Sequence, residues 1–166
     1  MSTEAPPLVP IPDTELSPMA VRFAGSAAPP PMRQAAARGK ALLPPPDLLV
    51  SIYQAAAYAE VGNDPDTAKV ARETAAALGE TPFRAGLQGN IPAPVLDFLG
   101  RALYRQRWAV EALLRHKNST DATIAFLALS CSADEVDLIA LDEQRLLKAP
   151  SVIAALYMNP NARSST

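Results

Sequence analysis

The sequence predicts an all-α protein, and three observations carry this prediction. From Asp47 onward, apolar residues recur three and four positions apart, which is the period of one helix face. No stretch alternates apolar and polar residues over more than a few positions, so strands are not expected. Eleven of the 17 prolines fall within the first 46 residues, where they interrupt any long helix, and only six follow.

The composition suits one modest domain. Of the 166 residues, 49% are apolar and 5% are aromatic, which predicts a core of small, closely packed side chains. The formal net charge of -2 argues against a strongly basic nucleic-acid-binding protein. No apolar run is long enough to cross a bilayer, and the first residues lack the features of a signal peptide. With its single cysteine, Cys131, the chain is expected in the reducing cytoplasm.

The proline-rich residues 1–43 are expected to form a flexible tail. Proline has no N–H and restricts the residue before it, so residues 1 to about 31 are expected to be extended and largely disordered. Residues 32–43 allow one short helix, which Gly39 weakens. A P-x-x-P pattern within residues 6–12 is either a ligand for an aromatic groove or only a spacer.

The predicted helical domain covers residues 44–166. Its first helix carries an apolar face from Leu48 to Ala56. The second begins at Asp64-Pro65, a capping carboxylate before a first-turn proline, and closes at Gly79. A glycine-rich connection then precedes a third helix that begins near Pro94. Four short helices follow, at residues 109–116, 121–129, 133–141 and 150–158, the third with a capping box at Ser132–Glu135.

Two segments in the second half of the chain resemble each other. Residues 109–118 align with residues 152–161 at an offset of 43, with an alanine and an asparagine identical at matched positions. Residues 98–100 align with residues 138–140 at an offset of 40. A period of this length carrying helix pairs is typical of helical repeats, in which each pair buries its apolar face by stacking on its neighbours. The sequence therefore predicts an α-solenoid of short antiparallel helix pairs.

The turns after these segments carry a family resemblance. Asn159-Pro160-Asn161 and the related Lys117-Asn118-Ser119-Thr120 are similar to the Asn-Pro-x-(Thr/Ser) turns of bacterial HEAT-like helical-repeat proteins. The chain resembles that family over about residues 44–166, although Lys117 stands where the other turn has Pro160. The resemblance implies an α-solenoid with a scaffolding role, of which this chain is the N-terminal part, and it supplies no catalytic residues.

The predicted repeat stops at Thr166, where its next helix should begin. The last predicted helix is then left with four apolar residues that have no covering layer: Val152, Ile153, Leu156 and Tyr157. Because a terminal repeat needs a polar outer face, two interpretations are open. Either the chain is part of a longer solenoid, or this open end docks a partner or a second copy.

Residue types that carry catalysis are scarce. His116 is the only histidine, which rules out a multi-histidine metal site within this chain. Cys131 has acidic neighbours, which do not activate a thiol. The acidic residues between 134 and 143 suit helix capping and solvation better than metal binding. No phosphate-binding glycine loop or nucleophile motif is present, so we expect no enzyme activity, no cofactor and no metal.

Charge is segregated between two neighbouring stretches. Residues 101–117 carry a local charge of +4, and residues 121–148 carry a local charge of -4. One interpretation is a ladder of solvated ion pairs between neighbouring helices, each worth ~0–1 kcal/mol. The other is a basic groove that faces a ligand, in which Trp108 stacks on a base instead of packing between helices. The candidate partner-binding residues are Arg101, Arg105, Arg107, Trp108, Arg115 and Lys117.

These observations favour a protein–protein interaction scaffold that binds another protein or further repeats. The alternative is a nucleic-acid-binding solenoid that uses the basic residues of 101–117. The net charge of -2 disfavours this alternative, because affinity for phosphate depends on an excess of positive charge.

Overall fold

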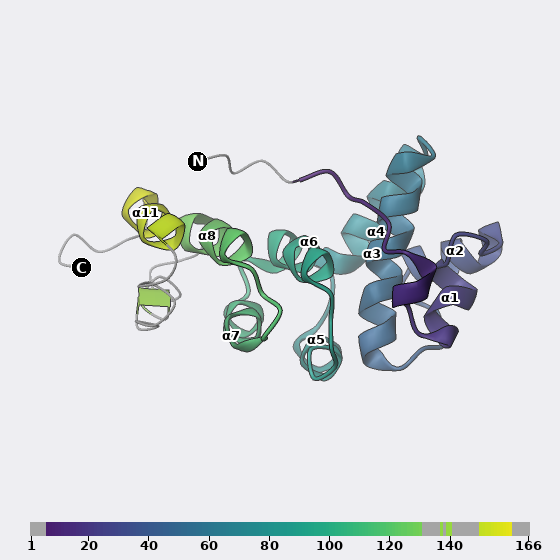
Figure 1. The fold of residues 1–166 in the computed structure, drawn as a ribbon, viewed down its shortest axis with the longest axis horizontal. Coiled ribbons are helices and arrows are strands. Elements are labelled where there is room, and N and C mark those ends of the chain that lie inside the picture. Colours follow the sequence, from purple (N-terminus) through teal and green to yellow (C-terminus); the bar gives the residue numbers. More distant parts are fainter. Residues whose placement is uncertain (1–5, 131–136, 138, 141–149, 161–166) are drawn as a thin grey trace. The chain divides into compact units, whose positions relative to one another are not determined.

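The computed structural model describes residues 6–130, 137, 139–140 and 150–160. Within these ranges the chain forms nine α-helices and one 3₁₀ turn, with no strand, which confirms the all-α prediction (Figure 1). The chain divides into two compact units, one of which is Pro6–Val95, while the other contains the residues from Leu96 onward. The sequence, in contrast, suggests a single boundary at residue 43.

The first unit is built around helix α3 (Pro45–Val61), in which ten of the 17 residues are buried. Four helices pack on it: α1 (Pro18–Ala24), α2 (Pro30–Ala37), α4 (Pro65–Ala76) and α5 (Glu80–Gly86). Alanines at positions 55, 56, 57 and 59 are all nearly inaccessible, so the neighbouring helices approach closely. A helix covered on several sides is mostly apolar around its circumference, and this accounts for the long apolar run of α3, in which Ser51 and Gln54 are the buried polar exceptions.

Residues 6–43 differ from the extended tail that the proline content predicts. The turn η1 (Asp13–Glu15) and helices α1 and α2 lie here, and both helices pack on α3. Pro18 and Pro30 stand in the first turn of these helices, where a missing N–H costs nothing. The prolines therefore begin helices instead of preventing them, and the alanines that follow are buried.

Helices α2 and α3 each end at a residue whose backbone has the left-handed conformation. Gly39, at φ 68°, closes α2, with its own N–H donating to Ala36 O and the Lys40 N–H donating to Ala35 O. The helix predicted over residues 32–43 thus begins and ends earlier. Asn63, at φ 55°, closes α3 in the same way, with the Asp64 N–H donating to Ala59 O.

Helix α4 begins as predicted and ends earlier than predicted. The Asp64 side chain accepts the Thr67 N–H, and Pro65 stands in the first turn, which confirms the predicted cap. The helix ends at Ala76 and not at Gly79, which instead precedes α5. The sequence does not predict α5, because its seven residues are too short to show a period; fully buried Phe83 anchors it.

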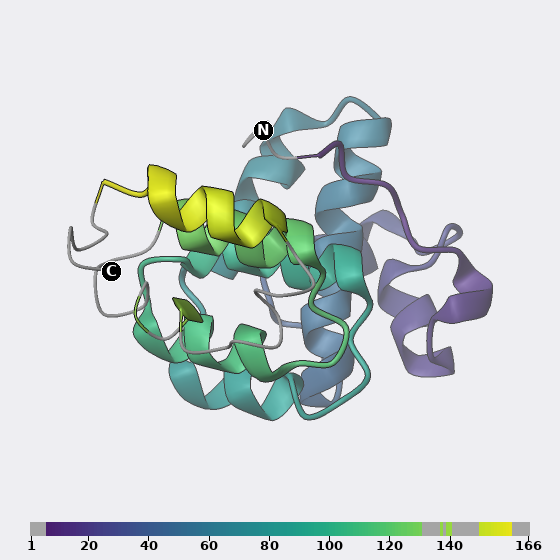
Figure 2. The same cartoon turned by 60° about the vertical axis from the view of Figure 1, so that its left-hand side comes forward.

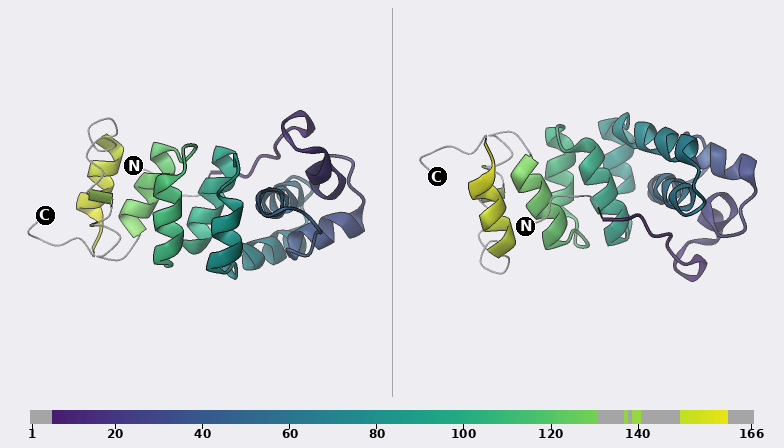
Figure 3. Two further views of the ribbon diagram at one scale, coloured as in Figure 1. Left: turned by 90° about the horizontal axis from the view of Figure 1, so that it is seen from below. Right: turned by 90° about the horizontal axis from the view of Figure 1, so that it is seen from above.

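The second unit contains most of helix α6 (Ala93–Leu103), together with α7 (Arg107–Arg115), α8 (Asp121–Ser130) and α11 (Pro150–Met158). The four corresponding predicted helices are confirmed, with α11 at its predicted bounds. Helices α8 and α11 lie side by side (Figures 2 and 3). A side chain at Gly100 of α6 would contact Leu113 of α7 and Thr123 of α8, so these three helices pack tightly.

Three predictions fall wholly or mostly outside the described residues. The predicted capping box at Ser132–Glu135 and the thiol of Cys131 lie outside the described residues, as does most of the predicted helix at 133–141. The contacts among the described helices establish an all-helical fold without clearly defining a solenoid.

Candidate functional site

Arg101, one of the predicted partner-binding residues, holds α6 to α8. Its Nε donates to Asp97 Oδ2 at 2.8 Å, and its guanidinium lies 4.4 Å above the ring of Phe126. The other carboxylate oxygen of Asp97 accepts the Thr123 hydroxyl at 2.8 Å. Only 18% of the Arg101 side chain is exposed, so this residue differs from the exposed contact that the sequence suggests.

The next candidates lie at the junction of α6 and α7. Arg105 is exposed, and its Nε donates to the Tyr104 hydroxyl at 3.1 Å. Arg107 pairs with Glu111 at 3.1 Å, one helical turn away, and 57% of its side chain is exposed. Such a pair contributes at most ~0.5 kcal/mol, so a ligand anion can replace Glu111 at little cost. Trp108 is half-buried, so its burial does not distinguish packing between helices from stacking on a base, the two roles that the sequence leaves open.

The last two cations flank a buried turn at the end of α7. Arg115 and Lys117 are exposed, whereas His116 between them is buried and its Nδ1 accepts the Asn118 N–H at 3.1 Å. The Ser119 hydroxyl donates to Leu113 O at 2.5 Å and closes the turn. Four of the five predicted cations, all except Arg101, are therefore exposed. Both described ion pairs of these cations, Arg101–Asp97 and Arg107–Glu111, run within one helix and not between helices.

Helix α11 has one buried face and one exposed face. Val152 and Ala155 are buried, and the Asn159 amide donates to Ala128 O at 2.6 Å, which holds the end of α11 to α8. Of the four predicted open-end residues, Val152 is therefore covered and Leu156 is half-buried. Ile153 and Tyr157 are exposed, at 37% and 79%. Met158, which the sequence analysis does not single out, is 65% exposed beside them.

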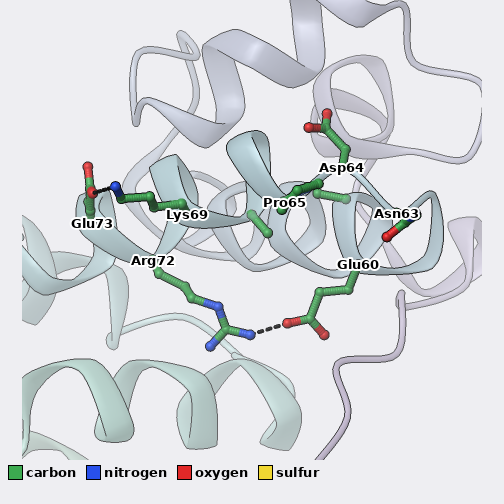
Figure 4. A pocket seen from close by; sticks show the side chains of 9 residues that line it. Glu60, Asn63, Asp64, Pro65, Lys69, Arg72 and Glu73 are labelled. Atoms are coloured by element: carbon green, nitrogen blue, oxygen red, sulfur yellow. Dashed lines mark hydrogen bonds and ion pairs between the residues drawn. The ribbon is translucent and has the colours of Figure 1, made fainter.

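A hollow of about 440 Å³ lies in the first unit, where α3 turns into α4 (Figure 4). Glu60 and Arg72 form an ion pair across it, and Lys69 pairs with Glu73 at 3.9 Å. These two ion pairs engage both cations of the hollow, and Asp64, which also lines it, accepts hydrogen bonds from Thr67, so the hollow has no unpaired cation for an anionic ligand. Of the residues that line this hollow, the sequence pattern marks only Asp64 and Pro65, as a helix cap.

A second hollow of about 280 Å³ lies between α2 and α3. The guanidinium of Arg33 lies 4.4 Å above the ring of Tyr58, and its Nη2 donates to Gly25 O at 3.1 Å and to Ser26 O at 2.6 Å. Burial raises the pKa of the Tyr58 hydroxyl above its ordinary value, and the charge of Asp13 adds to this effect while Arg33 opposes it. Arg33 therefore orders the connection between α1 and α2, as a structural group of this unit.

The Asp64 cap makes a testable contribution to acid stability. The Thr67 hydroxyl and N–H donate to the Asp64 carboxylate and hold its pKa below the ordinary 3.8. As the pH falls below about 4, the unfolded chain takes up this proton before the folded chain does, so stability falls until the folded pKa is passed. In the variant Asp64→Asn, which keeps the cap, we expect the free energy of unfolding to fall less between pH 5 and about 2.5 than in the native chain. Urea denaturation at each pH measures this free energy.

Asp66→Asn is the matched control for that change. It removes a carboxylate two positions away but leaves the cap in place, and we expect the acid loss of the native chain to persist in it. An equal response of the two variants contradicts the assignment of this effect to Asp64.

Comparison with protein-family models, with curated proteins and with solved structures gave no match for this chain. The similarity to HEAT-like proteins thus remains a prediction. Among the residues that the structure describes, no three His, Cys, Asp or Glu side chains are grouped so as to hold a metal ion. None of the described helices combines the length and apolarity that a bilayer crossing requires.

Proposed function

We propose that this chain is a protein–protein interaction module without chemistry of its own, built on HEAT-like repeats in its second unit. In this proposal, α7 and α11 are equivalent helices of successive repeats. Both helices have nine residues. The first residue of α11 lies 43 positions after the first residue of α7, and the same holds for their last residues; this equals the offset of the sequence repeat. The next residue is buried and polar in each case, His116 after α7 and Asn159 after α11.

The observation that carries the proposal is a difference in burial at equivalent positions. Val110 and Leu113 of α7 are fully buried. Their counterparts in α11 are Ile153, which is 37% exposed, and Leu156, which is half-buried. The same apolar positions are thus fully covered in α7 and only partly covered in α11. Since helical repeats bury their faces against the next layer, α11 offers a face to which an apolar helix of a partner can bind.

The exposed residues of α11 suit this role. Among the described residues, three of the seven large apolar side chains that face solvent lie on this one helix: Ile153, Tyr157 and Met158. Tyrosine and methionine are enriched in protein interfaces, because they bury a large apolar area and adapt to the partner surface. In this proposal, the exposed cations Arg107 and Arg115 of α7 form a second contact for the same class of partner.

Affinity capture from cell lysate tests the proposal with a charged substitution in this face. We expect the native chain to retain a partner that Tyr157→Asp retains at least about tenfold less, because a carboxylate is costly to bury in an apolar interface. Leu42→Asp is the matched control, since Leu42 is 88% exposed in the other unit, and it should retain the partner fully. Retention of the same proteins by all three chains contradicts the proposal.

The alternative function, nucleic-acid binding, predicts an affinity that depends strongly on salt concentration. Filter binding of single- and double-stranded nucleic acid over a salt series should show no strongly salt-dependent affinity if the module binds protein. If the chain binds nucleic acid in a salt-dependent way, and Arg105→Glu and Arg107→Glu abolish this binding, then the function is nucleic-acid binding and not the one proposed.

A further inference from the structure

Helix α3 binds the backbone of the extended residues 6–12 through two adjacent side chains. The Tyr53 hydroxyl donates to Val9 O at 2.8 Å and accepts the Val9 N–H at 3.3 Å. The Gln54 amide oxygen accepts the Ile11 N–H at 2.7 Å, and its nitrogen donates to Ile11 O at 3.1 Å. Each side chain thus satisfies both backbone groups of one residue, as a neighbouring β-strand would.

The spacing of the prolines matches this arrangement. In an extended chain the backbone groups of residues i and i+2 point to the same side, about 6.7 Å apart, so Val9 and Ile11 both face α3. Pro10 and Pro12 fall at the intervening positions, which have no N–H to satisfy. The alternation in Val-Pro-Ile-Pro therefore directs its only N–H donors toward Tyr53 and Gln54.

One side chain adds specificity to this recognition of the backbone. Ile11 is 5% exposed, whereas Val9 is 64% exposed and Pro12 also faces solvent. The surroundings therefore fit an apolar side chain at position 11 and place little restriction on the side chain at position 9. On the helix, Tyr53 and Gln54 are themselves almost completely buried, and Gln54 also donates to Ala24 O at 3.2 Å, so its amide is held in place.

We propose that Tyr53 and Gln54 form a binding site for an extended peptide of the pattern x-Pro-Ile-Pro, which residues 9–12 of this chain normally occupy. Residues 9–11 lie outside the helices, whereas Pro12 O accepts the Glu15 N–H of η1, so in this proposal the segment leaves α3 by a local opening that ends at η1. Its tether keeps it at an effective concentration on the order of millimolar, and an outside peptide must compete with that. This site lies in the first unit and does not depend on α11 or on the proposed function.

The experiment measures binding of a fluorescein-labelled peptide of residues 6–15 to the full chain by anisotropy. In the variant Ile11→Asp, a carboxylate replaces the buried isoleucine and displaces the chain's own segment from the site. We expect saturable binding to this variant, about tenfold or more tighter than to the native chain, because the competing segment is absent. Adding Tyr53→Phe, which removes only the hydroxyl, should weaken binding by about fivefold.

The control peptide carries Asp in place of Ile at position 11 and should not bind. Equal binding of both peptides, or no binding to a folded Ile11→Asp chain, overturns the proposal. If this variant does not fold, amide exchange of the native chain gives the answer. Millimolar peptide should then accelerate exchange of the Ile11 amide and leave the Ile52 amide of α3 unchanged, and an unchanged Ile11 rate overturns the proposal.

Discussion

Replacing Gln54 with leucine is expected to lower the free energy of unfolding by about 3 kcal/mol. Gln54 is fully buried, and its amide satisfies three backbone groups: Ile11 N–H, Ile11 O and Ala24 O. Leucine keeps the approximate volume of the side chain but has no polar atom. The three backbone groups then lose their partners in a place with little access to water, and each costs roughly 1 kcal/mol or more. Urea denaturation followed by circular dichroism measures the difference.

Gln88→Leu is the matched control for this substitution. Gln88 is an exposed glutamine in the same unit, so we expect its replacement to change the free energy of unfolding by less than about 0.5 kcal/mol. If both leucine variants have the same stability, the Gln54 amide does not hold residues 6–12 and Ala24 in the folded chain.

Enough length or a clear beginning makes helices α3 and α4 predictable, but a clear beginning alone does not suffice: α1 has a cap at Ser17 before Pro18 and still falls in the segment that the proline content predicts to be extended. Helix α3 shows several turns of apolar spacing, and α4 carries its cap at Asp64 and Pro65. Helix α5 has neither feature, since it is seven residues long and has no side-chain cap, and it escapes prediction. Local signals thus account for these successes and for this failure.

Residues 6–43 were harder to predict because the interactions that order them are not local. Tyr53 stands 44 residues from Val9, and Gln54 stands 43 residues from Ile11. No propensity or period within residues 6–12 reveals that a distant helix supplies their hydrogen bonds. A proline-rich segment therefore has the composition of a disordered tail even where it is ordered by contact with α3.

The candidate site was predictable in part from helix spacing. Asp97 and Arg101 are four positions apart, as are Arg107 and Glu111, and both pairs form within their helices. Applied to Arg101, this rule predicts a paired cation and not a free one. The additional contact of Arg101 with Phe126 joins two helices, so only the structure shows why this guanidinium is mostly covered.

Replacing Gly86 with alanine is expected to lower the free energy of unfolding by about 2 kcal/mol. Gly86 is the last residue of α5 and is buried where α5 packs on α3. An added Cβ would lie 2.7 Å from Leu49 Cγ and 3.1 Å from Pro45 O, both closer than van der Waals contact allows. Leu49 is 1% exposed and cannot turn away into solvent, and the backbone at Pro45 moves only if the start of α3 moves.

The gain in helix propensity on replacing glycine with alanine, at most about 1 kcal/mol, offsets only part of this overpacking. Gly79→Ala is the comparison without overpacking, because the nearest atom to its added Cβ is Pro82 Cδ at 3.8 Å, an ordinary contact; Gly79 is the N-cap of α5, so this variant gains no helix propensity. Its free energy of unfolding should stay within about 0.5 kcal/mol of the native value. Thermal denaturation of the two alanine variants side by side decides the matter: if Gly86→Ala is as stable as Gly79→Ala, then α5 does not require glycine for its approach to Leu49.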